Sequence, residues 1–244
     1  MELTAALEAQ DGLVCVVGAG GKKSTLYALA DQLGRAVVTA TVRIPIFDDH
    51  VAEVRVTEDP LAALAEVSDD AWPLGLVPER ERTDRYRGYD PETVGAIAAA
   101  APVGATLVKA DGARVRELKA PGEREPQLPA ATDVVVPIAS VRVVGQPLTD
   151  EVVHRPERVA AITGLSIGEE IRPEHVGTVL ASPEGGLKGV PEGATVIPLL
   201  NKVDDGEWEA LAREIAAAIR GRADVPRVVL TKLIADEPLV AVVD

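Results

Sequence analysis

The sequence predicts a doubly wound α/β fold with a mostly parallel sheet, of the kind found in P-loop NTPases. Apolar runs of strand length alternate along the chain with segments of helical periodicity. These runs are continuously apolar, which is typical of parallel strands covered on both faces. The first run, 13–17, leads through a glycine-rich turn into a helix. We expect a single nucleotide-binding domain over 1–244, with smaller insertions at about 43–103 and 113–190.

The N-terminal part supplies the first βαβ unit. Residues 3–9 have a helical pattern, and 13–17 is an uninterrupted apolar run. An Ala/Leu face at helical spacing predicts a helix over 24–33. The apolar run 36–41 then closes the unit through a right-handed crossover.

Weaker signals follow this unit. A short strand is expected at 54–56 and a helix at 60–67. Residues 73–89 carry several arginines among acids and prolines, and we expect them to form a mobile loop.

The later elements continue the alternation. Residues 105–110 form an apolar run that stops at an Asp-Gly pair, where a strand would end. The proline-rich segment 121–129 predicts a loop before the next strand. The segment 207–220 has apolar residues at helical spacing. The remaining expected strands are 133–137, 194–200, 227–230 and 239–243, and the remaining expected helices are 91–101, 156–163 and 173–181.

The composition favours a globular protein in a reducing compartment. Of the 244 residues, 47% are apolar, which suffices for a sizeable core. No apolar run approaches the roughly 18 residues of a membrane span, and the N-terminus lacks the features of a signal peptide. The only cysteine, Cys15, cannot form an internal disulfide. We therefore expect a cytoplasmic protein.

The charge excludes two classes of partner. A formal net charge of −14 argues against broad binding to nucleic acids or anionic membranes, because both need a basic surface. Arginine outnumbers lysine, and acids outnumber both together. Such an acidic, lysine-poor surface suits a cytoplasm at very high salt, so a halophilic source is a hypothesis.

The segment 16–25, VVGAGGKKST, carries the strongest chemical signal. Its glycines allow backbone N–H groups to turn toward phosphate oxygens, and the helix N-terminus adds positive potential. Lys22 would reach the β- and γ-phosphates, and a hydroxyl of Ser24 or Thr25 would ligate Mg²⁺. The residues expected to contact nucleotide here are Gly18, Ala19, Gly20, Gly21, Lys22, Lys23, Ser24 and Thr25.

This segment departs from the full G-x-x-x-x-G-K-[ST] pattern. With Lys22 at the lysine, Val16 stands at the first glycine and Lys23 at the hydroxyl. The shorter G-x-G-G-K form resembles the loop of Mur ligases. A tight strand-to-helix turn with solvated lysines is the alternative. The segment also comes within one residue of the fingerprint G-x-G-x-x-G, but no acid ends the second strand to hold a ribose, so an NAD-dependent oxidoreductase is less favoured.

Asp111 follows the apolar strand 105–110. At the carboxyl end of a parallel strand, its carboxylate would face the same crevice as the glycine loop and hold Mg²⁺ or its water shell. Lys22 and Asp111 are therefore the candidate catalytic residues, and Ser24 and Asp111 are the candidate metal ligands. An Asp-Gly turn without a ligand is an equally good explanation.

The segment Asn201-Lys202-Val203-Asp204 lies between an expected strand and an expected helix. It resembles the N-K-x-D segment with which GTPases read their base, and Asn201, Lys202 and Asp204 are the candidate base-binding residues. A carboxylate accepts two N–H groups from guanine, a pair that adenine lacks. Ordinary turn or N-cap chemistry is the alternative, so both ATP and GTP stay open.

The loop from Arg114 to Glu125 is densely charged. It would form a rim for an anionic substrate or partner, although a solvated, salt-bridged loop explains most of these side chains. His154 stands alone and is expected to be structural. The sequence has neither a Ser-His-Asp arrangement nor the Cys/His spacing of a zinc site. The rim side chains are Arg114, Arg116, Lys119, Glu123, Arg124 and Glu125.

Together these motifs resemble the YqeC family, the accessory proteins of selenium-dependent molybdenum hydroxylases. The matching stretches run in family order over most of the chain: VVGAGGKKST, VTATVRIP, ADGARVRELKAPGEREPQLP, TDVVVPI, VGQPLTDEVVHRPERVAAITG and GLKGVPEGATVIPLLNKVD. The resemblance implies a P-loop-like nucleotide-binding fold and a role in maturing molybdenum hydroxylases. Two positions depart from the family: Lys109 stands where an acid is usual, and Lys23 where Thr or Ser is usual.

These observations lead to one main hypothesis and one alternative. The main hypothesis is an NTP-binding maturation factor, with Mg²⁺ and ATP or GTP as cofactors, that acts as a slow NTPase or a phosphotransferase. Its partners would be the nucleotide and a molybdenum hydroxylase or its pterin cofactor. The alternative is a non-catalytic chaperone or scaffold that binds a pterin cofactor or an apo-hydroxylase.

Overall fold

The helices and strands have the following bounds. The strands are β1 (Gly12–Gly18), β2 (Ala36–Ala40), β3 (Ile44–Pro45), β4 (Glu53–Val56), β5 (Leu74–Val77), β6 (Arg85–Tyr86), β7 (Ala105–Lys109), β8 (Leu118–Lys119), β9 (Val134–Ser140), β10 (Val153–His154), β11 (Thr195–Val196), β12 (Leu199–Asn201), β13 (Val228–Thr231) and β14 (Leu239–Val243). The α-helices are α1 (Leu3–Ala6), α2 (Lys22–Leu33), α3 (Pro60–Ala65), α4 (Pro91–Ala100), α5 (Pro156–Thr163), α6 (Pro173–Leu180) and α7 (Gly206–Arg220).

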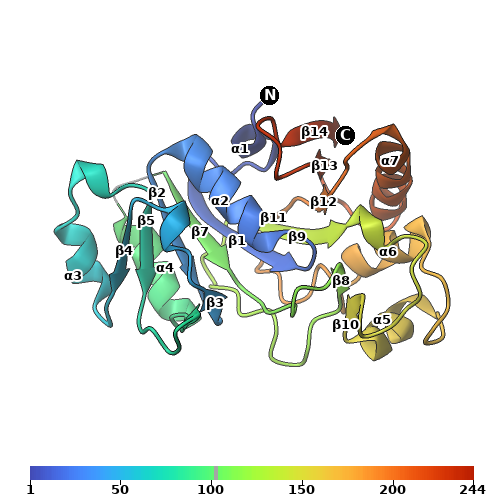
Figure 1. Cartoon of the computed structure of the whole chain (residues 1–244), viewed down its shortest axis with the longest axis horizontal. Coiled ribbons are helices and arrows are strands. Elements are labelled where there is room, and N and C mark those ends of the chain that lie inside the picture. The colour runs from blue at the N-terminus through green and yellow to red at the C-terminus, as the bar shows by residue number, and fades with distance from the viewer. Residues whose placement is uncertain (102–103) are drawn as a thin grey trace.

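One large sheet organises the chain (Figure 1). The computed structural model describes residues 1–101 and 104–244, so the insertion boundary expected near 103 lies outside the described residues. Within them the main sheet has ten strands in the order β14-β13-β12-β9-β1-β7-β2-β5-β4, and β11 pairs with β9 off this path. Neighbouring strands are parallel except β13 and β14, which are antiparallel at one edge. The ranges 43–103 and 113–190 both contribute strands to this sheet.

Helices cover both faces of the sheet because successive side chains of a strand point to opposite sides. Val14 and Val16 of β1 join the core that α1 and α2 cover. Leu13 and Cys15 join the core that α3 and α4 cover on the opposite face. The side chains of α6 and α7 extend that second layer over β12 and β13. The doubly wound, mostly parallel α/β fold is therefore confirmed.

The prediction of a mobile loop over 73–89 was wrong. This range contains β5, whose residues are all buried, and the short strand β6. β5 lies between β2 and β4 in the main sheet. The apolar run Leu74–Val77 has only four residues and is flanked by prolines, so its local signal is that of a loop. Pairing on both sides supplies the stability that the local sequence does not indicate.

A second correction concerns the strand expected at 194–200. The structure has two short strands there, β11 and β12, and both pair with β9. Pro198 lies between them and has no N–H group to donate to a ladder, which explains the interruption. The other expected elements are present with ends that differ by at most a few residues. One of these differences matters for the site: the helix expected over 24–33 begins at Lys22.

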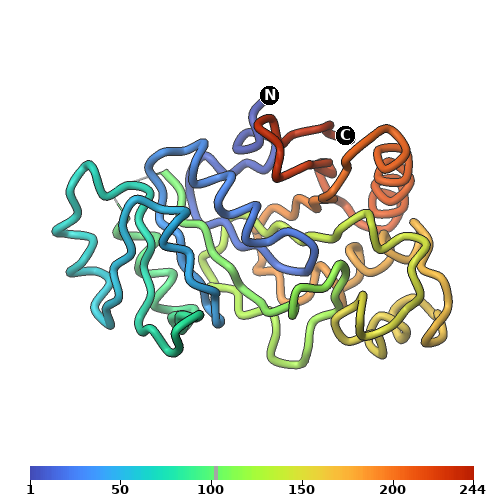
Figure 2. The backbone as a smooth tube through the Cα atoms, in the orientation of Figure 1, coloured from blue at the N-terminus to red at the C-terminus, as the bar shows by residue number. Residues whose placement is uncertain are grey.

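The order in which strands are added to the sheet reverses at β1. After β1 it builds the half of the sheet that carries α3 and α4, and then returns to form β7 beside β1 (Figure 2). It next passes to the other side of β1, where β9, β12 and β13 build the second half. The connections that leave β1 and β9 therefore diverge. In open α/β sheets such a point creates a crevice at the carboxyl ends of the strands, where ligands bind.

The backbone at Gly20 leaves no room for a side chain. Its φ is +84°, and a Cβ atom there would lie 2.6 Å from the backbone nitrogen of Ser140. We expect Gly20→Ala to lower the free energy of unfolding by more than the roughly 1–2 kcal/mol of left-handed backbone alone, as measured by urea denaturation. Gly34→Ala is the matched control, because Gly34 has a φ of +65° and no atom within 4 Å of an added Cβ. Equal losses at the two positions would contradict the prediction.

Candidate functional site

The candidate site lies at the carboxyl edge of the sheet, at the point where the connections diverge. The glycine loop follows β1, and Asp111 lies just beyond the end of β7. Ser140 ends β9, and Asn201 ends β12 directly opposite it in the ladder. The parallel order of these strands therefore brings together residues that are far apart in the sequence.

The glycine loop presents unused backbone donors. Gly18 has a φ of +90°, and its N–H donates to Asp111 Oδ2 over 2.9 Å. The N–H of Ala19 donates to the carbonyl of Ile138 over 2.9 Å. The N–H groups of residues 20 to 24 donate to no other group of the described chain. These groups surround the N-terminus of α2, where the helix dipole favours an anion.

Lys22 is the first residue of α2 and is only 6% exposed. Its Nζ atom lies 2.8 Å from Asp111 Oδ1 and donates a hydrogen bond to the carbonyl of Gly18. Burial lowers the pKa of Lys22, and the adjacent Asp111 carboxylate opposes that shift. The ammonium group therefore contacts the start of the loop at Gly18 and the carboxylate of Asp111.

Asp111 is buried between two ammonium groups. Its Oδ1 atom faces Lys22, although the angles of that contact are not those of a hydrogen bond. Its Oδ2 atom accepts the N–H of Gly18 and lies 2.8 Å from the Nζ of Lys119. Burial alone would raise the pKa of Asp111, but the charges of Lys22 and Lys119 outweigh it and hold the pKa below its ordinary value. The carboxylate is thus ionised and neutralised by the protein itself.

The ion pairs continue into the loop that the sequence marks as charged. Lys119, whose side chain is fully buried, lies 2.8 Å from Glu125 Oε2 and donates to the carbonyl of Gly112 over 2.5 Å. Arg155 lies 2.7 Å from the same oxygen of Glu125. Burial opposes ionisation of Glu125, but its bonds to Lys119 and Arg155 lower its pKa to about 2. Lys119 and Glu125, expected in a charged rim for an anionic substrate or in a solvated loop, contact one another next to Asp111.

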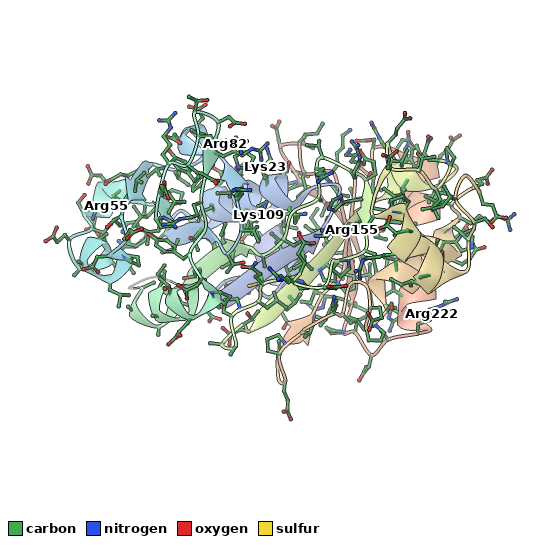
Figure 3. The ribbon with its side chains drawn as sticks, turned by 90° about the horizontal axis from the view of Figure 1, so that it is seen from below. Lys23, Arg55, Arg82, Lys109, Arg155 and Arg222 are labelled. Carbon is green, nitrogen blue, oxygen red and sulfur yellow. The ribbon has the colours of Figure 1, made fainter. Side chains whose placement is uncertain are left out.

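Lys109 adds a further buried ammonium. It is 6% exposed, and its Nζ donates to the carbonyl of Arg43 over 2.8 Å. Burial and the charge of Lys22 lower the pKa of Lys109 to about 7. Figure 3 shows Lys109, Lys23 and Arg155 toward the middle of the molecule, away from Arg55 and Arg222 near its two ends.

The low pKa of Lys109 predicts a pH dependence of stability. Between its folded pKa of about 7 and its ordinary value of 10.5, the unfolded chain binds more protons than the folded chain. The free energy of unfolding should therefore rise with pH across this range, by up to about 1.4 kcal/mol per pH unit from this group. Urea denaturation at a series of pH values measures the slope. Lys109→Met should flatten it, and an unchanged slope in that variant would contradict the prediction.

Asn201 ties the glycine loop to the end of β12. Its Nδ2 donates to the carbonyl of Gly20 over 2.8 Å, and its Oδ1 accepts the N–H of Leu233 over 3.3 Å. The same Oδ1 lies 3.3 Å from the hydroxyl of Thr231. A Cβ atom at Gly21 would lie 2.5 Å from Asn201 Nδ2. The amide nitrogen of Asn201 therefore holds the loop, and its amide oxygen is held by Thr231 and Leu233.

The other two candidate base-binding residues lie nearer the surface. Lys202 has a φ of +66°, and its Nζ contacts both carboxylate oxygens of Glu117 at 2.6 and 2.7 Å. Asp204 is paired with Arg142, which is half exposed. Neither of these surface ion pairs is costly to open. Arg114 and Arg116 of the charged loop make no ion pair in the described part of the chain.

An open pocket adjoins the ion pairs. It has a volume of about 560 Å³ and is lined by Arg124, Arg155 and Arg158, with Glu123 and Glu125 between them. Glu125 thus lines this pocket and also contacts Lys119. Three arginines and two glutamates thus lie at this pocket.

The expected Mg²⁺ ligands do not fit the ion. Each oxygen of Asp111 faces an ammonium group, so the carboxylate offers no free edge to a cation. In the described part of the chain, the polar partners of Asp111 are Gly18, Lys22 and Lys119, and the hydroxyl of Ser24 is not among them. Within residues 1–101 and 104–244, no three acidic, histidine or cysteine side chains gather as a metal site would require. The same part of the chain has no helix with both the length and the apolar character needed to cross a bilayer.

Comparison with known proteins places the chain in a family. The YqeC protein family matches residues 14–157, which is more than half of the chain and includes the glycine loop, Asp111 and Lys119. The uncharacterized protein YqeC of Escherichia coli (strain K12) is 27% identical over 201 residues, which cover 80% of this chain and 77% of that protein. The chain therefore belongs to the YqeC family.

Proposed function

We propose that this chain binds a nucleoside triphosphate at the Gly18–Gly21 loop. The observation that carries the proposal is the set of unused N–H groups around the start of α2, in the same loop whose Gly18 carbonyl binds the buried ammonium of Lys22. Such a group of donors, preorganised before the ligand arrives, stabilises an anion at no cost of rearrangement. The Lys22 ammonium exchanges its contact with Gly18 for a phosphate oxygen.

The base would lie between the ends of β12 and β13. Asn201 holds the loop to these strands, so it positions the phosphates relative to the base instead of reading the base. Lys202 and Asp204 are close to the surface and release their partners readily. The Asp204 carboxylate then accepts two N–H groups from guanine, which favours GTP over ATP.

We further propose that the bound nucleotide serves in the maturation of a molybdenum hydroxylase, including a selenium-dependent one. This part of the proposal is supported by membership in the YqeC family and by the resemblance of its motifs. Lys22 and the loop would stabilise charge on the transferring phosphoryl group of a slow NTPase or phosphotransferase. The open arginine-lined pocket next to Glu125 is the place where an anionic acceptor would lie.

The test is a titration of the whole chain with fluorescent ATP and GTP analogues. We expect saturable binding of both and tighter binding of the GTP analogue. Asp204→Asn should abolish the preference for guanine while it leaves the binding of the ATP analogue unchanged. No binding of either nucleotide at millimolar concentration would refute the proposal, and a preference for GTP that survives Asp204→Asn would refute the assignment of the base.

A second candidate function is a scaffold that holds a pterin cofactor. The same arginine-lined pocket favours it, because pterin cofactors of molybdenum enzymes carry a phosphate that arginine binds well. Arg158→Ala, together with Arg124→Ala, would then weaken pterin binding and leave nucleotide binding unchanged. If these variants weaken nucleotide binding equally, the pocket belongs to the nucleotide site.

A further inference from the structure

The positive charge beside Asp111 comes from lysine side chains. Lys119 lies 2.8 Å from both Asp111 and Glu125 and donates to the carbonyl of Gly112, so its ammonium is surrounded by acceptors. Lys22 faces the other oxygen of Asp111. A Mg²⁺ ion could bind Asp111 only if one of these buried ammonium groups were displaced. Displacement would leave a charge buried without its partner, which is strongly destabilising.

A lysine also stands where a P-loop carries its metal-binding hydroxyl. Lys23 directly follows Lys22, and a P-loop has its metal-binding hydroxyl at that position. Ser24 comes one residue later in α2, about 100° further around the helix axis, so its hydroxyl points in a different direction. Both positions from which a P-loop holds its metal therefore carry or contact an ammonium group.

The balance of charges in the site also argues against a bound divalent cation. Three cationic groups contact the two carboxylates of the site: Lys22, Lys119 and Arg155 contact Asp111 and Glu125. A divalent cation would increase this excess of positive charge in a low-dielectric setting, whereas a polyphosphate would neutralise it. Burial, and after it repulsion from Lys22, lowers the pKa of the nearby Lys109 to about 7, so a further positive charge is disfavoured here.

We propose that the loop binds the polyphosphate as a free anion, with Lys119 held on Asp111 where a P-loop protein holds its metal ion. This inference rests on the proposed nucleotide binding and specifies the form of its ligand. Lys22 and the loop N–H groups contact the phosphates, while Lys119 remains on Asp111 and supplies the second positive charge.

The test compares the affinity for a fluorescent GTP analogue in excess EDTA and in excess Mg²⁺ at equal ionic strength. We expect the dissociation constant in EDTA to be no larger than in Mg²⁺. A dissociation constant about tenfold larger in EDTA, equivalent to about 1.4 kcal/mol, would overturn the inference and leave nucleotide binding intact. Binding in neither buffer would overturn the proposed function itself, so the two failures are distinguishable.

Three variants of the full chain sharpen this test. Lys119→Met should weaken binding in EDTA at least tenfold, and Mg²⁺ should restore it because Asp111 then has a free oxygen. Lys188→Met is the matched control: Lys188 is partly buried and, in the described part of the chain, donates to the carbonyl of Gly122, so its loss should change neither affinity. Lys23→Thr lies at an exposed position and should tighten binding in Mg²⁺ alone. If Mg²⁺ changes the dissociation constants of Lys23→Thr and of the unmodified chain equally, the assignment of Lys23 to the position of the P-loop hydroxyl is contradicted.

Discussion

Lys22→Ala is expected to weaken nucleotide binding by about a hundredfold or more. The variant loses a charge-assisted hydrogen bond to phosphate in a buried setting, which contributes roughly 1.5–3 kcal/mol, and it loses the charge nearest to the loop. Asp111 keeps Lys119 as its partner, so the carboxylate is not left buried without a cation. Titration with a fluorescent GTP analogue measures the change in the dissociation constant.

Lys23→Ala is the control for this experiment. Lys23 neighbours Lys22 in the sequence but is exposed and makes no ion pair in the described part of the chain. Its loss should change the affinity severalfold at most, through screened electrostatics. The proposed role of Lys22 would be excluded by micromolar binding that survives Lys22→Ala, or by equal losses in the two variants.

Asp111→Ala is expected to produce the largest loss of stability among single substitutions in the site. Asp111 is the carboxylate that contacts both Lys22 and Lys119, and the three side chains are almost completely buried. Removal of one partner from a buried ion pair costs about 3–5 kcal/mol. The variant also loses the acceptor for the N–H of Gly18. Urea denaturation at neutral pH measures the loss.

Two comparisons identify the cause of that loss. Asp111→Asn retains an acceptor for Gly18 but not the charge, so it separates the hydrogen bond from the ion pairs. The double variant that combines Lys22→Met with Asp111→Ala should lose less stability than the sum of the two single losses, because it also removes one of the ammonium groups left without a partner. Additive losses would show that Lys22 and Asp111 do not interact in the folded protein.

Much of the fold could be predicted because its signals are local. The run 13–17, the glycine turn and the helix after it follow one another in the sequence, and each has its own pattern. β5 could not be predicted, since four apolar residues between prolines become a strand only when β2 and β4 pair with them. Pro198 likewise divides one expected strand into two.

The candidate site shows the same division. The sequence singled out Gly18–Gly21, Lys22 and Asp111, and the parallel sheet brings them together at one edge. It also assigned Mg²⁺ to Asp111 and placed Lys119 on a charged rim. The structure instead pairs Lys119 with Asp111. The preceding Asp-Gly turn and the proline-rich segment gave no indication that the chain folds back within a few residues to bury this lysine.

By itself the sequence determined the α/β class, the position of the glycine loop and membership in the YqeC family, because these depend on residue type and local spacing. The tertiary structure decided which charges face one another. Asn201 lies far along the chain from Gly20, yet it donates to the carbonyl of that residue. Lys119 lies in β8, which pairs with the distant strand β10, and its ammonium lies 2.8 Å from Asp111. Contacts between distant segments set the electrostatics of the site, and no local pattern encodes them.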